Sequence, residues 1–310
     1  MTITRTERGA RPLVSVCMPT YNRAHMVGLA IESVLDQSYR HLELIVVNDG
    51  STDCTREVLE AYAAKDSRIR VINKDNEGIP ATVNRGWVAA TGEFVTWTSD
   101  DNLYHRTALE TLTDSLVQSP HVMLVYADHR VIDAEGRLIE YPECYDPSSL
   151  ESHSVIYGCV LFRRSLFDHI GMFRQRWTRC HDFEFYRRVY KKYEIERIPK
   201  VLYDYRRHDA SMTGDHFAIT VEHAQLLDSV AETPKYRRAA WARCWHDIAR
   251  QAERDDRLFR AVWYHLRAAA KERPRWSTAR RAIRNAVYSL APSSLQRAWR
   301  VVKRSYTASC

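Results

Sequence analysis

Two adjacent carboxylates, Asp100 and Asp101, follow Ser99 at the end of an apolar, strand-like run over residues 92–98. Neighbouring carboxylates repel each other unless a cation lies between or beside them. Mg²⁺ and Mn²⁺ take oxygen ligands and commonly share one or two carboxylates with the phosphates of a substrate. Asp is also a favoured N-cap residue, so the pair suits a loop that caps a helix beginning near Arg106. By itself the pair leaves both a metal site and a capping loop open.

Polar residues also follow two other strand-like runs. Residues 20–23 come after the run over 13–18, and residues 48–51 come after the run over 43–47. Ligands of parallel α/β sheets bind at the carboxyl ends of the strands. We therefore expect these two segments and residues 99–101 to line one crevice.

The front of the chain alternates between strand-like and helical patterns. The strand-like runs also include residues 70–72, and helical patterns cover about 26–35, 53–64 and 80–90. This alternation predicts an α/β fold with a mostly parallel central sheet and helices on both faces. From about 120 to 215 the pattern is mixed, with strands predicted over 122–126 and 155–162 and a helix over 182–192. After about residue 217 the pattern is helical throughout, which predicts a C-terminal helical extension.

These patterns divide the chain into three predicted parts. They are a disordered N-terminus over residues 1–11, an α/β domain over 12–216 and a basic helical region over 217–310. No apolar run is long enough to span a bilayer, and the N-terminus lacks the apolar core of a signal peptide. The seven cysteines are odd in number, scattered and without a C-x-x-C pair, which argues against a disulfide framework and structural zinc. We therefore expect a cytoplasmic protein.

The charge is unevenly distributed along the chain. Residues 231–310 hold 19 Lys and Arg against 6 Asp and Glu, whereas the whole chain holds 46 against 39. Apolar stripes with Trp299 and Tyr306 alternate there with arginines at helical spacing, as in helices that lie peripherally on anionic membranes. Packing of the stripes on the catalytic domain is the alternative. Nucleic acid is disfavoured as a partner because no nucleic-acid motif accompanies the charge.

An ordered series of short motifs resembles family 2 glycosyltransferases. The motifs are residues 16–23 (VCMPTYNR), 45–53 (IVVNDGSTD), 76–78 (NEG), 84–86 (NRG), 91–94 (TGEF), 99–102 (SDDN), 170–173 (IGMF), 181–184 (HDFE) and 205–208 (YRRH). The resemblance covers about residues 12–215. It implies the GT-A (Rossmann-like) fold and inverting transfer of a sugar from a nucleotide-diphosphate donor to a glycan or a polyprenyl-linked lipid.

The resemblance also implies which residues bind the donor. They are Thr20, Tyr21, Arg23, Asp49, Asn84, Asp100 and Arg206. Tyr21 would pack against the nucleobase and Asp49 would accept a hydrogen bond from its imide edge. An ordinary turn is the alternative for Asp49, since Asp-Gly-Ser is good turn chemistry. Arg206 would pair with phosphate through its planar guanidinium.

For the metal and the chemical step, the resemblance implies three further residues. Asp101 would be a ligand of a divalent cation, Mn²⁺ or Mg²⁺, with Asp100 toward the ribose or the metal shell. His208 would complete the metal or phosphate contacts, or would be an ordinary polar loop residue. Asp182 is the candidate general base that takes the proton of the acceptor hydroxyl. Glu184 is the second candidate for the base, and helix capping is the alternative role of Asp182.

Two departures from the family pattern leave the donor open. Asn48 stands where the family often has an acid, and Val83 stands where it often has an arginine, so Arg85 is an alternative phosphate contact. UDP is the default nucleotide, and GDP or dTDP fits the same motifs. Two other functions compete with the glycosyltransferase interpretation: a degenerate relative without turnover and a sugar-phosphate nucleotidyltransferase.

A nucleotidyltransferase would have a Gly-rich loop with a basic residue after the first strand, and residues 19–22 are not such a loop. A dinucleotide-dependent oxidoreductase is excluded because no G-x-G-x-x-G follows the first strand.

Overall fold

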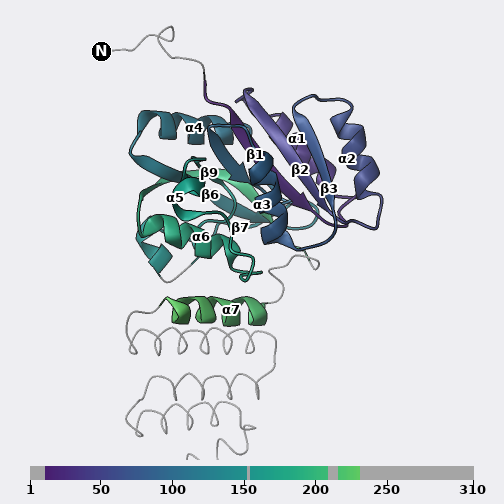
Figure 1. The fold of residues 1–310 in the computed structure, drawn as a ribbon. Coiled ribbons are helices and arrows are strands. Elements are labelled where there is room, and N and C mark those ends of the chain that lie inside the picture. The colour runs from purple at the N-terminus through teal and green to yellow at the C-terminus, as the bar shows by residue number, and fades with distance from the viewer. Residues whose placement is uncertain (1–10, 152–153, 209–215, 231–310) are drawn as a thin grey trace, which may run out of the picture. The chain divides into compact units, whose positions relative to one another are not determined.

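The computed structural model describes residues 11–151, 154–208 and 216–230 (Figure 1). The chain divides into two compact units, Met1–Ser211 and Met212–Cys310. In the second unit the described element is helix α7 (His216–Ser229). The predicted basic helices beyond residue 230 lie outside the described residues, as does the predicted disordered N-terminus apart from Arg11. Among the helices of the described part, none has the length and apolar character that crossing a membrane requires.

Four parallel strands form the first half of the sheet. They lie in the order β3-β2-β1-β4, with bounds β1 (Val14–Thr20), β2 (Leu42–Asp49), β3 (Ile69–Lys74) and β4 (Phe94–Trp97). All residues of β1 are buried, because helices cover both faces of this half. The parallel arrangement brings the ends of β1, β2 and β4 to the same edge of the sheet.

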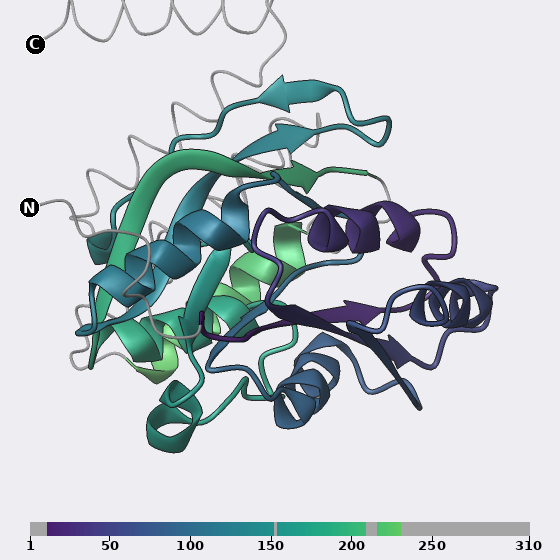
Figure 2. The same cartoon turned by 90° about the horizontal axis from the view of Figure 1, so that it is seen from above.

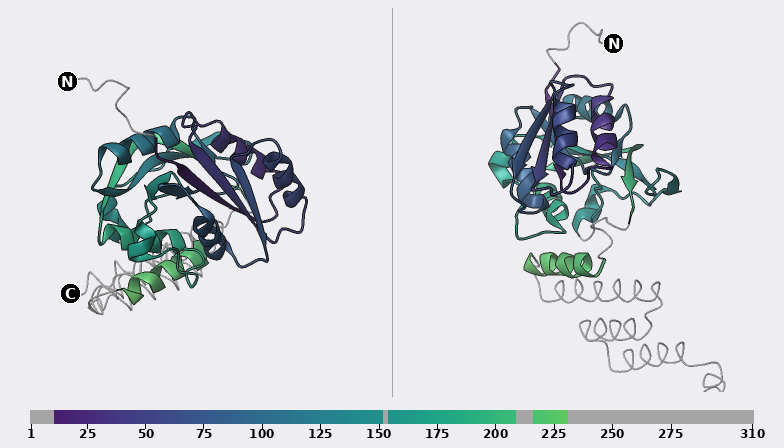
Figure 3. Two further views of the ribbon diagram at one scale, coloured as in Figure 1. Left: turned by 45° about the horizontal axis from the view of Figure 1, so that its top comes forward. Right: turned by 90° about the vertical axis from the view of Figure 1, so that its right-hand side faces the viewer.

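Two layers of helices cover the sheet (Figure 2). One layer holds α1 (Val27–Leu35), α2 (Thr55–Ala63) and α4 (Ala108–Gln118), whose apolar residues join one core with Val14, Val16 and Met18. Figure 3 shows α1 and α2 side by side. The other layer holds α3 (Ile79–Ala89), α5 (Leu166–Ile170) and α6 (His181–Tyr190).

An aromatic cluster joins the helices of the second layer. The ring of Trp87 on α3 lies 5.0 Å from that of Phe167 on α5 and 5.7 Å from that of Phe185 on α6. Close packing on the sheet is secured at Gly86, where a Cβ would lie 2.0 Å from Sγ of Cys17 on β1. Any larger residue would push α3 away from β1. Gly86 therefore sets the distance between the sheet and the helix that carries Asn84.

The second half of the sheet is mixed. It holds β5 (Leu103–Tyr104), β6 (Val122–Ile132), β7 (Leu138–Glu140), β8 (Val160–Arg163) and β9 (Glu194–Arg206). Strands β6 and β9 are parallel, whereas β4–β8, β6–β8, β5–β9 and β6–β7 are antiparallel. A short 3₁₀ helix, η1 (Pro147–Glu151), precedes β8. The α/β class is confirmed, and the predicted parallel sheet is correct for the first half but too simple for the second.

Strand β9 was absent from the predicted strands, although it is the longest in the sheet. It is the strongly bent green strand of Figure 2, and its pairing with β6 shifts register near Asp128. These shifts and Pro199 break the period-two pattern by which strands are recognised. β8 begins at Val160, later than predicted, because Gly158 has φ of +101° and interrupts the extended backbone.

Candidate active site

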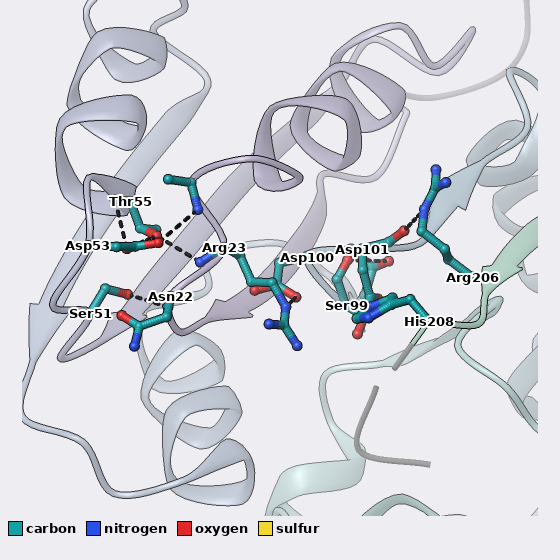
Figure 4. A network of polar contacts seen from close by, with 12 residues as sticks. Asn22, Arg23, Ser51, Asp53, Thr55, Ser99, Asp100, Asp101, Arg206 and His208 are labelled. Carbon is teal, nitrogen blue, oxygen red and sulfur yellow. Dashed lines mark hydrogen bonds and ion pairs between the residues drawn. The ribbon is translucent and has the colours of Figure 1, made fainter. Parts of the chain in front are cut away.

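The β4–β5 loop carries Asp100 and Asp101 between the end of β1 and the end of β9 (Figure 4). Buried contacts hold this loop from both sides. The backbone N–H of Thr98 donates to the carbonyl of Cys17 at 2.9 Å, and the hydroxyls of Thr98 and Tyr203 lie 2.7 Å apart. The two carboxylates are therefore presented by a fixed loop at the carboxyl edge of the sheet.

Asp101 pairs with His208, which follows β9. Nε2 of His208 lies 3.0 Å from Oδ2 of Asp101. The second carboxylate oxygen, Oδ1, is buried and has no hydrogen-bond partner among the residues that the structure describes. A buried carboxylate oxygen without a partner is costly unless a cation or another donor meets it. A carboxylate oxygen is a ligand that both Mn²⁺ and Mg²⁺ prefer, whereas an imidazole is typical of transition metals, so this pair suits Mn²⁺ better than Mg²⁺.

The described residues hold no cluster of three or more His, Cys, Asp or Glu side chains that could ligate a metal ion. Asp101 and His208 together supply only part of a coordination sphere. Mg²⁺-type sites in proteins commonly take one or two carboxylates and complete the sphere with substrate phosphates and water. The pair therefore fits a cation that is held jointly with a phosphate-bearing substrate.

Asp100 is buried next to Arg23. Nε of Arg23 lies 3.9 Å from Oδ1 of Asp100, and 8% of the Asp100 surface is exposed. Burial and, after it, the neighbouring Asp101 raise the pKa of Asp100 to about 7, against the opposing effects of Thr20, Arg23 and the Tyr21 backbone N–H. Positive charge at this edge of the sheet therefore stabilises the ionised form of Asp100.

The β1–α1 loop is braced by the loop that follows β2. Asn22 has φ of +52°, a left-handed conformation that Asn tolerates better than most residues. Its side-chain Oδ1 accepts a hydrogen bond from the N–H of Thr52 at 2.7 Å, and its own N–H donates to Oγ of Ser51 at 2.9 Å. Two further backbone N–H groups, of Arg23 and Ala24, donate to Thr55 Oγ1 and Asp53 Oδ2 (Figure 4).

This brace sets the position of Tyr21 and Arg23, the residues on either side of Asn22. Tyr21 is 44% exposed at the end of β1, so its ring is accessible to a planar ligand. Thr20, the last residue of β1, is buried beneath it. The loop thus offers an open aromatic ring and a cation on the same side as Asp100.

Asp49 ends β2 and binds the loop after β3. Oδ1 accepts hydrogen bonds from Nζ of Lys74 and from the N–H of Glu77, and Oδ2 accepts one of 2.9 Å from the N–H of Gly78. Burial alone would raise the pKa of Asp49, but these hydrogen bonds lower it. The carboxylate is therefore ionised and shapes the loop before α3. Its contact with a nucleobase stays a prediction.

Arg206 and Asn84 both make structural contacts in the described residues. The Arg206 guanidinium donates to the backbone carbonyls of Asp101, Asp133 and Ala134, at 2.9, 3.1 and 2.7 Å. A guanidinium has five N–H donors, so part of its capacity remains. The Asn84 side chain bonds both the N–H and the carbonyl of Phe173, which ties α3 to the segment before α6. Contacts of either side chain with phosphate stay predictions.

Asp182 lies in the first turn of α6, where its Oδ1 accepts a hydrogen bond of 2.7 Å from the N–H of Phe183. Tyr186 stands one turn later, and its hydroxyl accepts a hydrogen bond of 2.9 Å from Nε1 of Trp97, the last residue of β4. Residues four apart lie on the same face of a helix. Asp182 therefore lies on the face of α6 that turns to the carboxyl edge of the sheet.

Glu184 is engaged in a different way. Nε of Arg188 lies 2.9 and 3.0 Å from its two oxygens, and Nη1 of Arg174 lies 3.1 Å from Oε1. The Glu184 side chain is 5% exposed. A buried carboxylate with both oxygens paired to arginine is a poor proton acceptor. The geometry therefore favours Asp182 over Glu184 as a base.

Comparison with known proteins identifies the family. Residues 15–171 match the model of glycosyl transferase family 2. The chain belongs to this family. This glycosyltransferase is 32% identical to an uncharacterized glycosyltransferase of Rickettsia typhi over 214 residues, which make up 66% of each chain. It thus matches just under two thirds of that relative's length.

Solved structures share the fold of the glycosyltransferase. Residues 1–349 of S. aureus TarS match with a TM-score of 0.56 and 19% identity over 88% of both chains, and TarS has also been crystallised with UDP and with UDP-GlcNAc. The mannosyltransferase PcManGT from Pyrobaculum calidifontis, in complex with GDP-Man and Mn²⁺, matches with a TM-score of 0.58 and 20% identity, over 94% of this chain and 83% of its own. At such identities the likeness concerns the fold.

Sequence reasoning missed several residues that shape the site. Asn22, Lys74 and Tyr203 touch or support predicted site residues but were not among the candidates. Asn22 lies inside the first motif, and an Asn in a turn shortly after a strand tolerates the left-handed conformation. Lys74 and Tyr203 carry no such signal, because their roles depend on which strands are neighbours.

Proposed function

We propose that this family 2 glycosyltransferase moves a sugar from a nucleotide-diphosphate donor to a hydroxyl group of a glycan or lipid-linked acceptor. The reaction is a single displacement that inverts the anomeric carbon. The observation that carries the proposal is the buried, unpartnered Oδ1 of Asp101, beside His208 and at the edge where β1, β2 and β4 end. A phosphate-bearing donor with its cation would supply the missing partner.

The nucleotide binds at the ends of β1 and β2. Tyr21 packs against the base, and Arg23 and Asp100 flank the ribose and diphosphate. The exposed Tyr21 ring and the braced loop around it support this placement. TarS binds UDP and PcManGT binds GDP-Man, so the shared fold serves both nucleotides. UDP remains the default donor for this chain, with GDP and dTDP as alternatives.

Asp101 and His208 hold the divalent cation, Mn²⁺ or Mg²⁺, together with the diphosphate. Bound there, the cation neutralises negative charge on the departing nucleotide diphosphate. Arg206 fixes the carbonyl of Asp101 and so keeps its carboxylate in place. The Mn²⁺ of the PcManGT complex supports the choice of cation.

Asp182 accepts the proton of the acceptor hydroxyl as that oxygen attacks the anomeric carbon. Its position in the first turn of α6, on the face toward Trp97 at the end of β4, supports this role. Glu184 is committed to Arg188 and Arg174 and acts by holding α6 in place.

A thermal-shift panel tests the proposal. UDP, GDP, dTDP and their common sugars are added with and without Mn²⁺ to the wild type, Asp101→Asn and the matched surface variant Asp114→Asn. We expect one nucleotide to raise the Tm only with Mn²⁺, in the wild type and Asp114→Asn but not in Asp101→Asn. No shift with any nucleotide would instead favour a degenerate relative that binds a different partner.

A further inference from the structure

Three aromatic rings from separate elements gather in the second half of the sheet. The ring of Tyr157, before β8, lies 4.6 Å from that of His129 on β6 and 6.1 Å from that of Tyr205 on β9. The rings of His129 and Tyr205 are also 6.1 Å apart. His129 is 6% exposed and Tyr157 is 43% exposed, so this cluster is closed on one side and open at Tyr157.

His129 and Tyr157 carry no charge at neutral pH. Burial lowers the pKa of His129 to about 4, despite the opposing effects of Asp128 and Glu140. Burial and then the charge of Asp182 raise the pKa of Tyr157, which also places Tyr157 within electrostatic reach of Asp182. Two of the three rings are therefore uncharged at neutral pH, and one of them lies within electrostatic reach of the candidate base.

The backbone directly after Tyr157 packs closely against a residue that supports the carboxylate loop. Gly158 has φ of +101°, and a Cβ there would lie 2.8 Å from the hydroxyl of Tyr203. The same hydroxyl lies 2.7 Å from Oγ1 of Thr98, two residues before Asp100. Backbone packing at Gly158 thus ties Tyr157 to the loop that carries Asp100.

Tyr205 is tied to the same loop through the residue that follows it. The backbone N–H of Arg206 donates to Oδ1 of Asn102 at 2.7 Å, and its Nε donates to the carbonyl of Asp101 at 2.9 Å. The backbone next to two of the three rings is therefore anchored near the proposed metal ligand and its neighbours. An anchored backbone limits how far such a surface moves when it orients a ligand for reaction.

We propose that Tyr157, His129 and Tyr205 form an aromatic platform on which a sugar ring of the acceptor stacks, with its reacting hydroxyl toward Asp182. A pyranose ring has a face of C–H groups that packs on the negative face of an aromatic ring, and its hydroxyls stay at the rim. A half-open aromatic surface within electrostatic reach of the base suits this chemistry. A linear polyol offers no such face. The inference rests on the proposed function and narrows its acceptor to a glycan that presents a ring.

Saturation-transfer NMR tests the platform without requiring turnover. The probes are the methyl β-glycosides of glucose, galactose and N-acetylglucosamine, with ribitol as the linear control, in the presence of UDP and Mn²⁺. Tyr157→Leu removes the ring, Tyr157→Phe keeps it, and Tyr62→Leu on α2 is the matched control on the other helix layer. Unfolding midpoints establish that each variant is folded.

We expect saturation of the C–H protons of at least one glycoside in the wild type, Tyr157→Phe and Tyr62→Leu, and about fivefold weaker binding in Tyr157→Leu. Equal binding by Tyr157→Leu and the wild type, preference for ribitol, or no saturation by any glycoside would overturn the platform. Nucleotide binding in the same samples separates the two proposals. If the nucleotide binds but no glycoside does, only the platform proposal is wrong. If the nucleotide does not bind either, the proposed function is wrong as well.

A second arm of the experiment distinguishes the source of the ring. The same sugar is offered as a methyl glycoside and as a short-chain prenyl diphosphate conjugate. Stronger saturation of the sugar protons in the conjugate indicates a lipid-linked acceptor, and equal saturation indicates a free glycan. Both results support a ring on the platform, whereas saturation confined to the prenyl chain contradicts it.

Discussion

Nε2 of His208 lies 3.0 Å from Oδ2 of Asp101, although 107 residues separate the two along the chain. The pairing exists because β9 runs beside β6 and ends next to the β4–β5 loop. His208 contacts only Oδ2 of the two carboxylate oxygens, and within the described part of the chain Oδ1 of Asp101 is a buried oxygen without a hydrogen-bond partner. The contact with His208 therefore orients the Asp101 carboxylate through Oδ2 and leaves Oδ1 to ligate a cation.

His208→Gln should weaken Mn²⁺-dependent nucleotide binding by about tenfold or more, as losses around metal sites commonly do. Glutamine keeps polarity at the position but removes the imidazole. Calorimetry of UDP binding with Mn²⁺ and with EDTA measures the effect. His105→Gln, which changes a histidine paired with Asp204, should leave the Mn²⁺ dependence unaltered. Equal loss in both variants would mean that His208 acts only through folding.

Asp182→Asn should lower sugar transfer by about 100- to 10,000-fold, because the acceptor hydroxyl loses its proton acceptor. Donor affinity should stay within about twofold of the wild type, since Asp182 is placed on the acceptor side. Single-turnover transfer and equilibrium binding of the donor separate the two effects. A variant that loses donor binding instead would assign Asp182 to the donor site.

Glu184→Gln should act on stability rather than on chemistry. It leaves Arg188 beside a neutral amide in a buried position, which costs about 3 kcal/mol in the free energy of unfolding. Urea unfolding measures that loss, and transfer per folded molecule should remain close to the wild type. If transfer is abolished while the free energy of unfolding is unchanged, Glu184 is the base.

Asn22→Gly should weaken nucleotide binding by about fivefold with little change in stability, because it removes the two hydrogen bonds that Oδ1 of Asn22 accepts from the N–H and the hydroxyl of Thr52. Glycine keeps the positive φ of Asn22, so backbone strain does not confuse the result. Thr52→Val is the matched comparison, since it removes only the longer bond of 3.3 Å from the Thr52 hydroxyl and keeps the backbone N–H donor, so its affinity should stay closer to the wild type. Fluorescence titration with UDP compares the variants, and unaltered affinity in Asn22→Gly would remove the role of the brace.

Truncation after Glu272 removes nine basic residues and no acidic one. If the predicted amphipathic helices bind membrane, the shortened chain should sediment less with vesicles that contain anionic lipid, and the difference should shrink as salt is raised. Neutral vesicles provide the control. Equal sedimentation of both chains would favour packing of these helices on protein.

The sequence predicts the fold well where the pattern of apolar residues along a strand matches the burial of that strand in the folded sheet. Strands β1 and β2 are continuous apolar runs because both their faces are buried, and the polar residues after them mark the carboxyl edge. Asp100 and Asp101 could be found in the same way. Their burial and the pKa of Asp100 could not, since these depend on Arg23 and on neighbouring strands.

The second half of the sheet shows what local pattern leaves out. β9 carries Pro199 and register shifts, and it becomes a strand only because β6 and β5 pair with its two edges. The platform residues Tyr157 and Tyr205 likewise meet only once β9 is in place. Arg206 matched a phosphate contact by its motif, whereas three of its hydrogen bonds go to carbonyls that the fold brings together.

Asp204 links three strands and should make stability depend on acid pH. Its carboxylate accepts hydrogen bonds from Arg130 at 2.6 and 3.0 Å and lies 2.6 Å from Nε2 of His105. Burial alone would raise the pKa of Asp204, but these partners lower it to about 2. The folded pKa lies below the unfolded value of about 3.9, so its contribution to stability is complete above about pH 4.

As the pH falls from about 4 through 2, that contribution of about 2 kcal/mol should be lost from the free energy of unfolding. Asp204→Asn lacks the titrating carboxylate. The difference in free energy of unfolding between the wild type and this variant should therefore become smaller as the pH falls from about 4 to 2. Asp66→Asn is the control, because Asp66 pairs with Arg68 near the surface and such pairs contribute less than about 1 kcal/mol. Urea unfolding at pH 7, 5, 4 and 3 measures the gap. A gap that stays constant over this range would mean that Asp204 is held by packing and not by its charge.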